Sequence, residues 1–440
     1  MNNKLQERLS EILVQELIPA LGCTEPIAIA YCSSAAAKAL GEEADRILVE
    51  ASSNIIKNVK SVVVPNSQGM KGIAASAILG MLSASPEFKL EVLKNLTDEQ
   101  IAKAKELEAA GFCEITRLDT DQPLHLKVHI YKGEREAVAE IVTAHTNLVS
   151  LVVDGKELLE EKEQEEGNAM GDDFSGIRLS DLIDYAEANN FGAALETLKN
   201  QVETNSKICK EGLENNWGAE VGRYHQALAD EQKSLEFLKL DVRKEAEARH
   251  LAVGMAAAGS DARMSGCDMP VVINSGSGNQ GMTVSMPLLA YAMVYGIEQE
   301  RLLQALALAN LTALYQKSTI GRLSAFCGAV SAAVGSACGI AWMMGDSREV
   351  IEKTIINTLG TVAGMVCDGA KPSCASKIAA SVSSALDGLA LARRGISFEA
   401  GDGIVKENAD ETIAAIGRMA RFGMRSTDAE IIDIMLEEKA

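Results

Sequence analysis

The chain has 440 residues, of which 47% are hydrophobic and 24% charged, as in an ordinary globular protein of two or three domains. Its formal net charge of −20 at pH 7 predicts neither a nucleic-acid nor a membrane partner, because both present anionic surfaces. The nine cysteines, without secretory features, indicate reduced thiols and a cytoplasmic location. Charges throughout the N-terminal helix predict that it is not a signal peptide.

The first 84 residues are expected to form the N-terminal helical part of a larger core. Residues 1 to about 40 have helical spacing in two segments, and the second starts at GCTEP, with Thr24 as N-cap and Pro26 in the first turn. Residues 46–53 predict a strand. The following apolar run, SVVVPNSQGMKG, ends in a turn that precedes an Ala-rich helix from about residue 73.

Residues 85–165 predict a small α+β module. Residues 98–110 have helical spacing, whereas between about 112 and 160 the hydrophobic period changes to two. The segments EITRL, LHLKVHIYKG and EAVAEIVTAHTNLVSLVVDG therefore predict antiparallel strands, with turns at YKGE and VDGK. The acidic segment EEKEQEEGNAMGDD that follows predicts a solvated linker.

Residues 166–440 predict a helical domain with Gly-rich interruptions and no parallel sheet, because its β-branched runs are short. The uncharged stretch from Ser324 to Gly345 is long enough to cross a bilayer, but it consists mostly of small residues. We therefore expect a buried helix of a bundle. The predicted fold class is α+β and mostly α, in which a large all-helical core carries a smaller antiparallel-sheet module.

Two turns of similar sequence predict sites for an anionic group. VVVPNSQGM and VVINSGSGNQGM both enter an Asn/Ser/Gln/Gly turn and then a helix. Backbone N–H groups and short polar side chains at a helix start bind carboxylates or phosphates, and ordinary turn and capping chemistry is the alternative. The candidate substrate-binding residues are Asn66, Ser67, Gln68, Ser275, Ser277, Asn279 and Gln280.

Three cysteines, Cys327, Cys367 and Cys374, are the strongest candidates for chemistry. Thiolates are soft ligands that favour zinc, copper(I) or iron–sulfur clusters. A closed zinc site needs four ligands, usually from CxxC pairs, and the sequence has no CxxC and no histidine near this triplet. Three cysteines without a local fourth fit a [4Fe-4S] cluster with one iron open to substrate, and burial as small apolar residues is the alternative.

Cys23 stands immediately before a helix, in GCTEP. A helix N-terminus lowers the pKa of a thiol, and the resulting thiolate can act as base, nucleophile or ligand. Glu25 is either a second candidate base or a first-turn charge. Cys32 and Cys338 are assigned to packing, and the five histidines form no ligand spacing, so core or surface positions are expected for them.

Several motifs occur together over nearly the whole chain: GCTEP, Lys57-Asn58 followed by VVVPNSQG, INSGSGNQG, K-x3-GRLSAFCG and CDGAKPSC. In combination they resemble the L-cysteine desulfidases, or UPF0597 (YhaM-like) proteins, which are related to the iron–sulfur L-serine dehydratases. FCGAVSAAVGSAC and CDGAKPSC echo the dehydratase motifs GCQGEVGSAC and TCDP with a later PC. The resemblance implies that Cys327, Cys367 and Cys374 ligate a [4Fe-4S] cluster. Some dehydratases place a C-terminal cysteine on the fourth iron, but this chain ends IMLEEKA, which makes Cys23 the internal candidate.

The resemblance also implies non-redox β-elimination of a small amino acid, with L-cysteine giving sulfide, pyruvate and ammonia. Lys317 is expected to neutralise the substrate or contact the leaving group. Asn58 is expected to hydrogen-bond the amino acid, and Thr24 is grouped with the substrate-binding residues. L-Serine dehydratase activity on the same scaffold and a non-catalytic cluster sensor are the alternatives. We further expect Cys23 to face the three cysteines across one cavity, and a homodimer is a further possibility.

Overall fold

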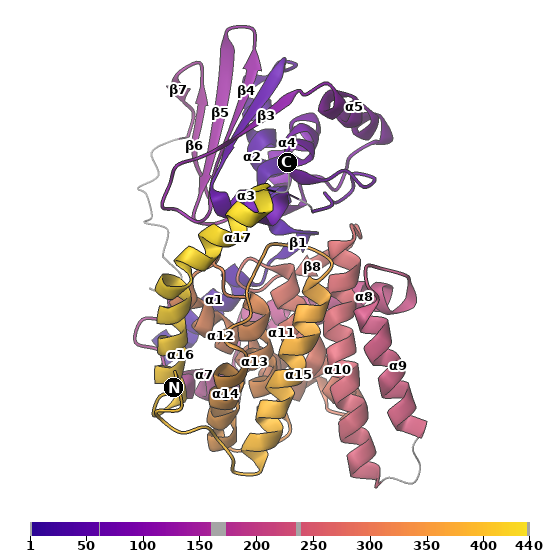
Figure 1. Cartoon of the computed structure of the whole chain (residues 1–440), viewed down its shortest axis with the longest axis vertical. Helices are drawn as coiled ribbons and strands as arrows, with labels where there is room; N and C mark the ends of the chain where they lie inside the picture. The colour runs from indigo at the N-terminus through magenta and orange to yellow at the C-terminus, as the bar shows by residue number, and fades with distance from the viewer. Residues whose placement is uncertain (1, 61, 160–172, 235–238, 438–440) are drawn as a thin grey trace.

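The computed structural model describes residues 2–60, 62–159, 173–234 and 239–437. Figure 1 shows a sheet with its covering helices at one end and a bundle of long helices at the other. The predicted acidic linker falls on residues 160–172, outside the described residues, apart from Asp173. This arrangement confirms the fold class expected from the sequence, α+β and mostly α.

Six strands form one sheet in the order β3-β2-β4-β5-β6-β7. Their bounds are Arg46–Ala51 (β2), Cys113–Arg117 (β3), His125–Lys132 (β4), Arg135–Val142 (β5), Leu148–Val153 (β6) and Lys156–Glu157 (β7). The predicted antiparallel pairing is confirmed along β4 to β7. Strand β2 also pairs antiparallel with β4, a partner that the sequence did not predict. The prediction is wrong at β3, which runs parallel to β2. The three helices between these two strands provide the long crossover that a parallel pair requires.

Two helices of the N-terminal segment lie against this sheet. The helices of this region are α2 (Thr24–Leu40), α3 (Ser53–Val59), α4 (Gly72–Ser83), the 3-10 helix η1 (Pro86–Glu91) and α5 (Asp98–Ala109). Helix α2 packs on β4, β5 and α4. The backbones of α2 and α4 approach so closely that a Cβ at Gly80 would lie 2.2 Å from the carbonyl oxygen of Ala30. Small residues thus join this part of the chain to the sheet, and the domain divisions at residues 84 and 165 stay predictions.

The second half of the chain forms the helical bundle together with the N-terminal helix α1. Its helices are α1 (Asn3–Glu16), α7 (Leu179–Ala188), α8 (Ala194–Glu214), α9 (Val221–Ser234), α10 (Leu240–Met264), α11 (Gly278–Tyr295), α12 (Gln299–Ile320), α13 (Gly328–Met343), α14 (Arg348–Val362), α15 (Cys374–Arg393), α16 (Ala409–Arg418), η2 (Met419–Gly423) and α17 (Arg425–Glu437). From residue 173 onward, β8 (Pro270–Val272) is the one strand among the described residues. The expected helical domain without a parallel sheet is therefore confirmed.

Helix α13 is the central helix of the bundle. It contacts α11, α12, α14 and α15, and all of its residues from Ala329 to Met343 are buried. A Cβ at Gly335 would lie 2.4 Å from the carbonyl oxygen of Ala309, so the small side chains allow α12 and α13 to pack closely. The uncharged stretch is thus a buried bundle helix, as expected. No helix in the described part of the chain is long and apolar enough to cross a membrane.

Two connections join the sheet end to the bundle. Strand β1 (Pro19–Leu21), just before α2, pairs antiparallel with β8, just before α11. At the other side, α17 runs from the bundle to α3, as Figure 1 shows. These connections place the starts of α2 and α11 together at the junction, where the predicted functional residues also lie.

Candidate functional site

Three of the four singled-out cysteines lie at helix starts. Cys23 is the N-cap of α2, Cys327 is the N-cap of α13, and Cys374 is the first residue of α15. The N-cap predicted at Thr24 is therefore one residue too late. Helix N-termini carry a partial positive charge and free N–H groups, which favour thiolates. The three helix starts thus direct N–H groups and partial positive charge at these sulfur atoms, and this effect opposes the cost of burying them.

Cys327 and Cys367 are brought together by a short antiparallel pairing of two loops. Phe326 and Val366 form an isolated β-bridge. The N–H of Cys327 donates to the carbonyl of Met365 at 3.0 Å, and the N–H of Cys367 donates to the carbonyl of Ala325 at 2.6 Å. Cys327 and Cys367, which are forty residues apart in the sequence, are therefore neighbours in the structure.

The loop between Cys367 and Cys374 lies against α3. Gly369 has φ +91°, and a Cβ there would lie 2.6 Å from the carbonyl oxygen of Lys57. The ammonium of Lys57 lies 3.4 Å from the carbonyl oxygen of Cys367, to which it donates. The N-terminal segment therefore forms one wall of the cysteine site, and glycine is required where the two backbones meet.

The thiols lie within one another's electrostatic reach. Burial raises the pKa of Cys327 to about 12, and negative charge on Cys367 and Cys374 adds to this effect. The pKa of Cys374 is likewise raised by burial and by Cys367. Cys338 is different, because its pKa is raised by burial alone. The structure thus groups the three predicted ligands and leaves Cys338 as a separate packing residue.

Cys23, at the start of α2, lies next to this group. It packs with Val62 and Met264, and Cys374 packs against the same small cluster. Its pKa is raised well above its ordinary value by burial and by Glu25, while Arg263 opposes the shift and Cys374 and Cys367 add to it. The lowered pKa predicted from the helix N-terminus is therefore wrong for the protein alone, because desolvation outweighs the helix end.

Two lysines supply positive charge to the thiols. Lys317, with only 1% of its side chain exposed, has its pKa lowered to about 8 by burial, against the influence of Cys367 and Cys327. Its ammonium donates to the carbonyl of Arg322 at 3.3 Å. Lys377 also faces Cys327 and Cys367, and it pairs with Asp368. The thiols therefore have cations at hand that reduce the cost of ionisation.

The three thiols form no site for a single metal ion. Within the described ranges, no three His, Cys, Asp or Glu side chains are grouped so as to hold one metal ion. In a [4Fe-4S] cluster each cysteine binds a different iron, so the ligands of such a cluster need not meet at one point. All nine cysteines are free of disulfides, so the three thiols are available as ligands.

Glu25 organises a buried polar group beside Cys23. Its carboxylate accepts hydrogen bonds from the hydroxyl of Thr24 at 3.1 Å and from the amide of Asn58 at 3.0 Å. The hydroxyl of Thr24 also lies 2.7 Å from the carbonyl oxygen of Gly276. Three predicted residues, Thr24, Glu25 and Asn58, thus meet the turn that precedes α11.

That turn contains four predicted substrate-binding residues in different surroundings. Ser275 is buried at φ 48°, and Ser277 caps α11 by accepting from the N–H of Gln280 at 3.4 Å. Asn279 accepts a hydrogen bond from Arg263. The side chain of Gln280 is buried against Gly328, next to Cys327. The second turn therefore reaches both the Glu25 group and the thiols.

The first turn is occupied by structural contacts. The backbone N–H of Asn66 donates to Asp268 at 2.7 Å, and its amide donates to the carbonyl of Leu93 at 3.0 Å. The hydroxyl of Ser67 donates to the carbonyl of Val64 at 2.6 Å, and Gln68 bonds outward to Asp98 and Lys105. None of these contacts involves the cysteines, and the turn meets the site through Pro65, which abuts Gly22.

Two residues at the site were missed by sequence reasoning. Arg263, at the end of α10, is buried and donates to Asn279 and to the carbonyl of Gly22, close to the charges of Cys23 and Cys374. His145, in the loop after β5, lies 4.0 Å from Glu25, measured from Nε2 to Oε1. Neither Arg263 nor His145 belongs to a sequence motif of ligand or catalytic residues, so no spacing pattern could have identified it.

Several buried polar atoms of the site have no protein partner among the described residues. They are Asn58 Oδ1, His145 Nε2, Arg263 Nε and Gln280 Oε1. Buried polar atoms are nearly always hydrogen-bonded, so these four atoms, on residues that contact Glu25 or the turn before α11, are candidates to bind a polar ligand.

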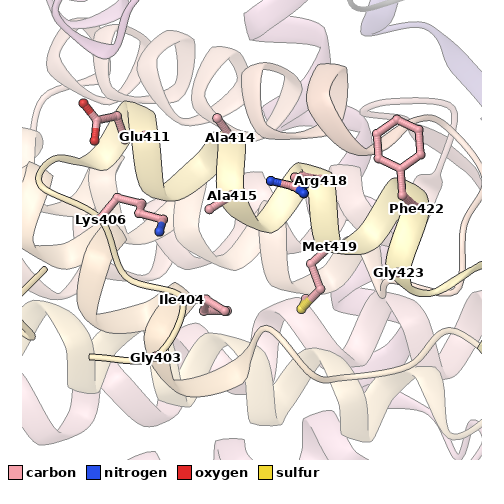
Figure 2. A pocket seen from close by; sticks show the side chains of 10 residues that line it. All are labelled: Gly403, Ile404, Lys406, Glu411, Ala414, Ala415, Arg418, Met419, Phe422 and Gly423. Carbon is pink, nitrogen blue, oxygen red and sulfur yellow. The ribbon is translucent and has the colours of Figure 1, made fainter. Parts of the chain in front are cut away.

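A separate groove of about 830 Å³ lies along α16 and η2. Figure 2 shows Met419 and Phe422 on the helical side of this groove and Ile404 on the facing loop. None of the predicted site residues lines it. This groove is therefore distinct from the thiol site.

The protein is a helical bundle with a small sheet beside it, and three of its cysteines lie at helix starts. The comparison with known families assigns it to a class. The serine dehydratase alpha chain model matches residues 87–433. The chain is 46% identical over 432 residues to a UPF0597 protein of Lachnoclostridium phytofermentans, covering 98% of this chain and 100% of that protein. It is 42% identical to a UPF0597 protein of Treponema denticola, with both chains covered completely. The chain therefore belongs to the serine dehydratase alpha chain family.

Proposed function

We propose that this protein is a [4Fe-4S]-dependent L-cysteine desulfidase of the cytoplasm. The observation that carries the proposal is the grouping of Cys327, Cys367 and Cys374 with Cys23 beside them, next to buried polar groups suited to an amino acid. Cys327, Cys367 and Cys374 would hold the cluster. When bound, it supplies a Lewis acid for the sulfur of the substrate.

The protein residues around the thiols suit the other parts of the substrate. Asn58 and Gln280 each have a buried oxygen without a protein partner, which suits the ammonium group. The buried cations Arg263 and Lys317 suit the carboxylate and the leaving sulfur. Removal of the α-proton lets the C–S bond break, hydrosulfide leaves, and the enamine tautomerises and hydrolyses to pyruvate and ammonia.

Cys23 has two roles open in this proposal, namely ligand of the fourth iron at rest, or base once substrate arrives. Its raised pKa means that the free thiol is protonated at neutral pH. A soft metal next to the sulfur favours the thiolate, so the ligand role agrees better with burial. Glu25 would then hold Thr24 and Asn58 in place rather than react itself.

L-Serine dehydratase activity is the second candidate, and the family match favours it. The two reactions differ only in the leaving group, which is hydroxide instead of hydrosulfide. A non-catalytic cluster sensor is a third reading, but it gives no reason for buried polar orphans beside the thiols.

The test is an anaerobic assay of reconstituted protein for pyruvate and sulfide, with L-cysteine and L-serine as parallel substrates. We expect a higher kcat/KM for L-cysteine. Cys23→Ala should abolish sulfide release and keep most of the cluster absorbance, whereas Cys327→Ala should lose the cluster itself. Cys338→Ala is the matched control, because this buried thiol lies outside the group, and it should keep both properties.

Three outcomes would contradict the proposal. Preferred turnover of L-serine would replace it by the second candidate. An intact cluster without turnover of either substrate would favour a sensor. Full cysteine turnover by Cys23→Ala would reduce Cys23 to a packing residue.

A further inference from the structure

We propose that His145 is the general base that removes the α-proton of the substrate, an inference that rests on the proposed β-elimination. Its lone pair on Nε2 takes the proton, the C–H electrons form the Cα=Cβ bond, and the C–S electrons leave with hydrosulfide. The proton then passes from Nε2 to solvent at the end of the cycle.

The position of His145 supports this role. Its side chain is only 6% exposed, and Nε2 is a buried atom without a hydrogen-bond partner. The ring packs on Gly276, where a Cβ would lie 3.1 Å from Cε1, and the carbonyl of Gly276 accepts the hydroxyl of Thr24. A glycine at this point lets the turn before α11 lie directly on the ring, so the imidazole is held against the substrate-binding turn.

The other candidate bases are less suited to accept a proton. The carboxylate of Glu25 accepts a hydrogen bond from the amide of Asn58 at 3.0 Å, and its other oxygen lies 3.1 Å from the hydroxyl of Thr24. Cys23 is a buried thiol with a raised pKa, and the ammonium of Lys317 donates to a carbonyl. Among these four residues, His145 is the one with a buried side-chain nitrogen or oxygen, Nε2, that has no hydrogen-bond partner in the described part of the chain.

The charges around His145 suit a base that ionises during the reaction. Burial lowers its pKa, Arg322 acts in the same direction, and Glu25 and Glu16 oppose them. The ring is therefore neutral at pH 7, as a base must be. Once it has taken the proton, Glu25 at 4.0 Å stabilises the imidazolium.

His145 also lies on a continuous chain of neighbours that encloses the thiols. Arg322 is close to His145, and its carbonyl accepts a hydrogen bond from Lys317, which faces Cys327. On the other side, Glu25 connects His145 to Cys23, which faces Cys374. The proposal requires that a substrate whose sulfur is at the thiols direct its α-carbon toward His145.

The first test is made on the cluster-free protein. Histidine labelled with ¹⁵N gives five ring systems, and the spectrum of His145→Asn identifies the one that belongs to His145. At pH 7 we expect a neutral ring with an unprotonated Nε2. A charged ring, or a proton on Nε2, overturns the assignment before any activity is measured.

The second test follows the α-proton in the reconstituted enzyme. With α-deuterated L-cysteine and L-serine, exchange with solvent is measured together with pyruvate release, KM and cluster absorbance. His145→Asn should lower both exchange and turnover by about 100-fold or more, which is typical of a lost general base, and leave KM and the cluster nearly unchanged. His145→Gln is the second variant in case the first does not fold.

The pH profile distinguishes a base from a merely structural residue. In the wild type, kcat/KM should rise with pH as His145 loses its proton, and this limb should be absent from the variant. Glu25→Gln should move the limb to lower pH, because the carboxylate that raises the pKa of His145 is removed. His225→Asn is the matched control, since this ring on α9 also has an unpartnered nitrogen but lies outside the site.

The outcomes separate the two proposals. If the wild type turns over cysteine or serine and His145→Asn keeps its exchange, its rate and its acidic limb, the base assignment fails alone. If the wild type with an intact cluster turns over neither amino acid, the proposed function fails and the base assignment falls with it.

Discussion

A buried ion pair fixes the C-terminal helix to the cysteine site. Lys57 on α3 has only 1% of its side chain exposed, and its ammonium lies 2.5 Å from Asp428 on α17. The same ammonium donates to the carbonyl of Cys367 at 3.4 Å. Lys60, one turn further on, donates to the carbonyl of Met435. The loop of Cys367, helix α3 and helix α17 therefore share one buried cation.

Removal of the Asp428 charge and removal of the Lys57 charge are expected to lower the free energy of unfolding by different amounts. Asp428→Asn leaves a buried ammonium without its counter-charge, which costs about 3–5 kcal/mol. Lys57→Met removes the buried charge and leaves Asp428, which is 15% exposed and keeps contact with water, so we expect about 1–3 kcal/mol. The double variant should regain much of the loss caused by Asp428→Asn, because no unpaired buried charge remains.

Hydrogen exchange of α17 measures this difference. A loss of about 3 kcal/mol raises the opening equilibrium by roughly 150-fold, so the amides of residues 425–437 should exchange correspondingly faster in Asp428→Asn. Glu203→Gln is the control, because its pair with Lys207 on α8 is exposed and screened by solvent and should therefore contribute little to stability. An equal or smaller effect of Asp428→Asn than of Lys57→Met would refute the reasoning.

Two further predictions concern stability. Burial raises the pKa of Asp261 to about 6, so the folded state binds more protons than the unfolded state between about pH 4 and 6. The free energy of unfolding should therefore fall as the pH rises through this window, and Asp261→Asn should remove that part of the fall in thermal melts. Gly80→Ala should destabilise the protein by about 1–3 kcal/mol despite alanine's better helix propensity, since the new Cβ meets the backbone of Ala30. Gly364→Ala, where a Cβ meets nothing within 4 Å, is the comparison by urea unfolding.

Local patterns predicted the elements of the fold, but not all of their pairings. The hydrophobic period identified the strands between residues 112 and 160 and the helices after residue 173, because burial of one face imposes that period. The same pattern did not predict the partner of β3, which pairs in parallel with β2. Strand direction depends on the path of the intervening chain, here α3, α4 and α5, and this is a property of the tertiary structure.

The site was partly predictable for a similar reason. Cys23 precedes a helix in the sequence, and short motifs drew attention to the other three cysteines. The predicted lowering of the pKa of Cys23 was wrong, because the thiol is buried against Val62 and Met264, which are distant from it in sequence. His145 and Glu25 are 120 residues apart and belong to different elements, so only folding makes them neighbours.

The position of the site follows from how helix starts are brought together. The starts of α2 and α11 are held side by side by β1 and β8, and the start of α13 is tied to the Cys367 loop by the Phe326–Val366 bridge. Each helix start presents N–H groups and partial positive charge to the same region. A protein with a net charge of −20 thus gathers partial positive charge at one junction, although burial still raises the pKa of the thiols there. Buried cations at Arg263, Lys317 and Lys57 add to this positive charge, and their distances from one another in sequence explain why no single motif contains the site.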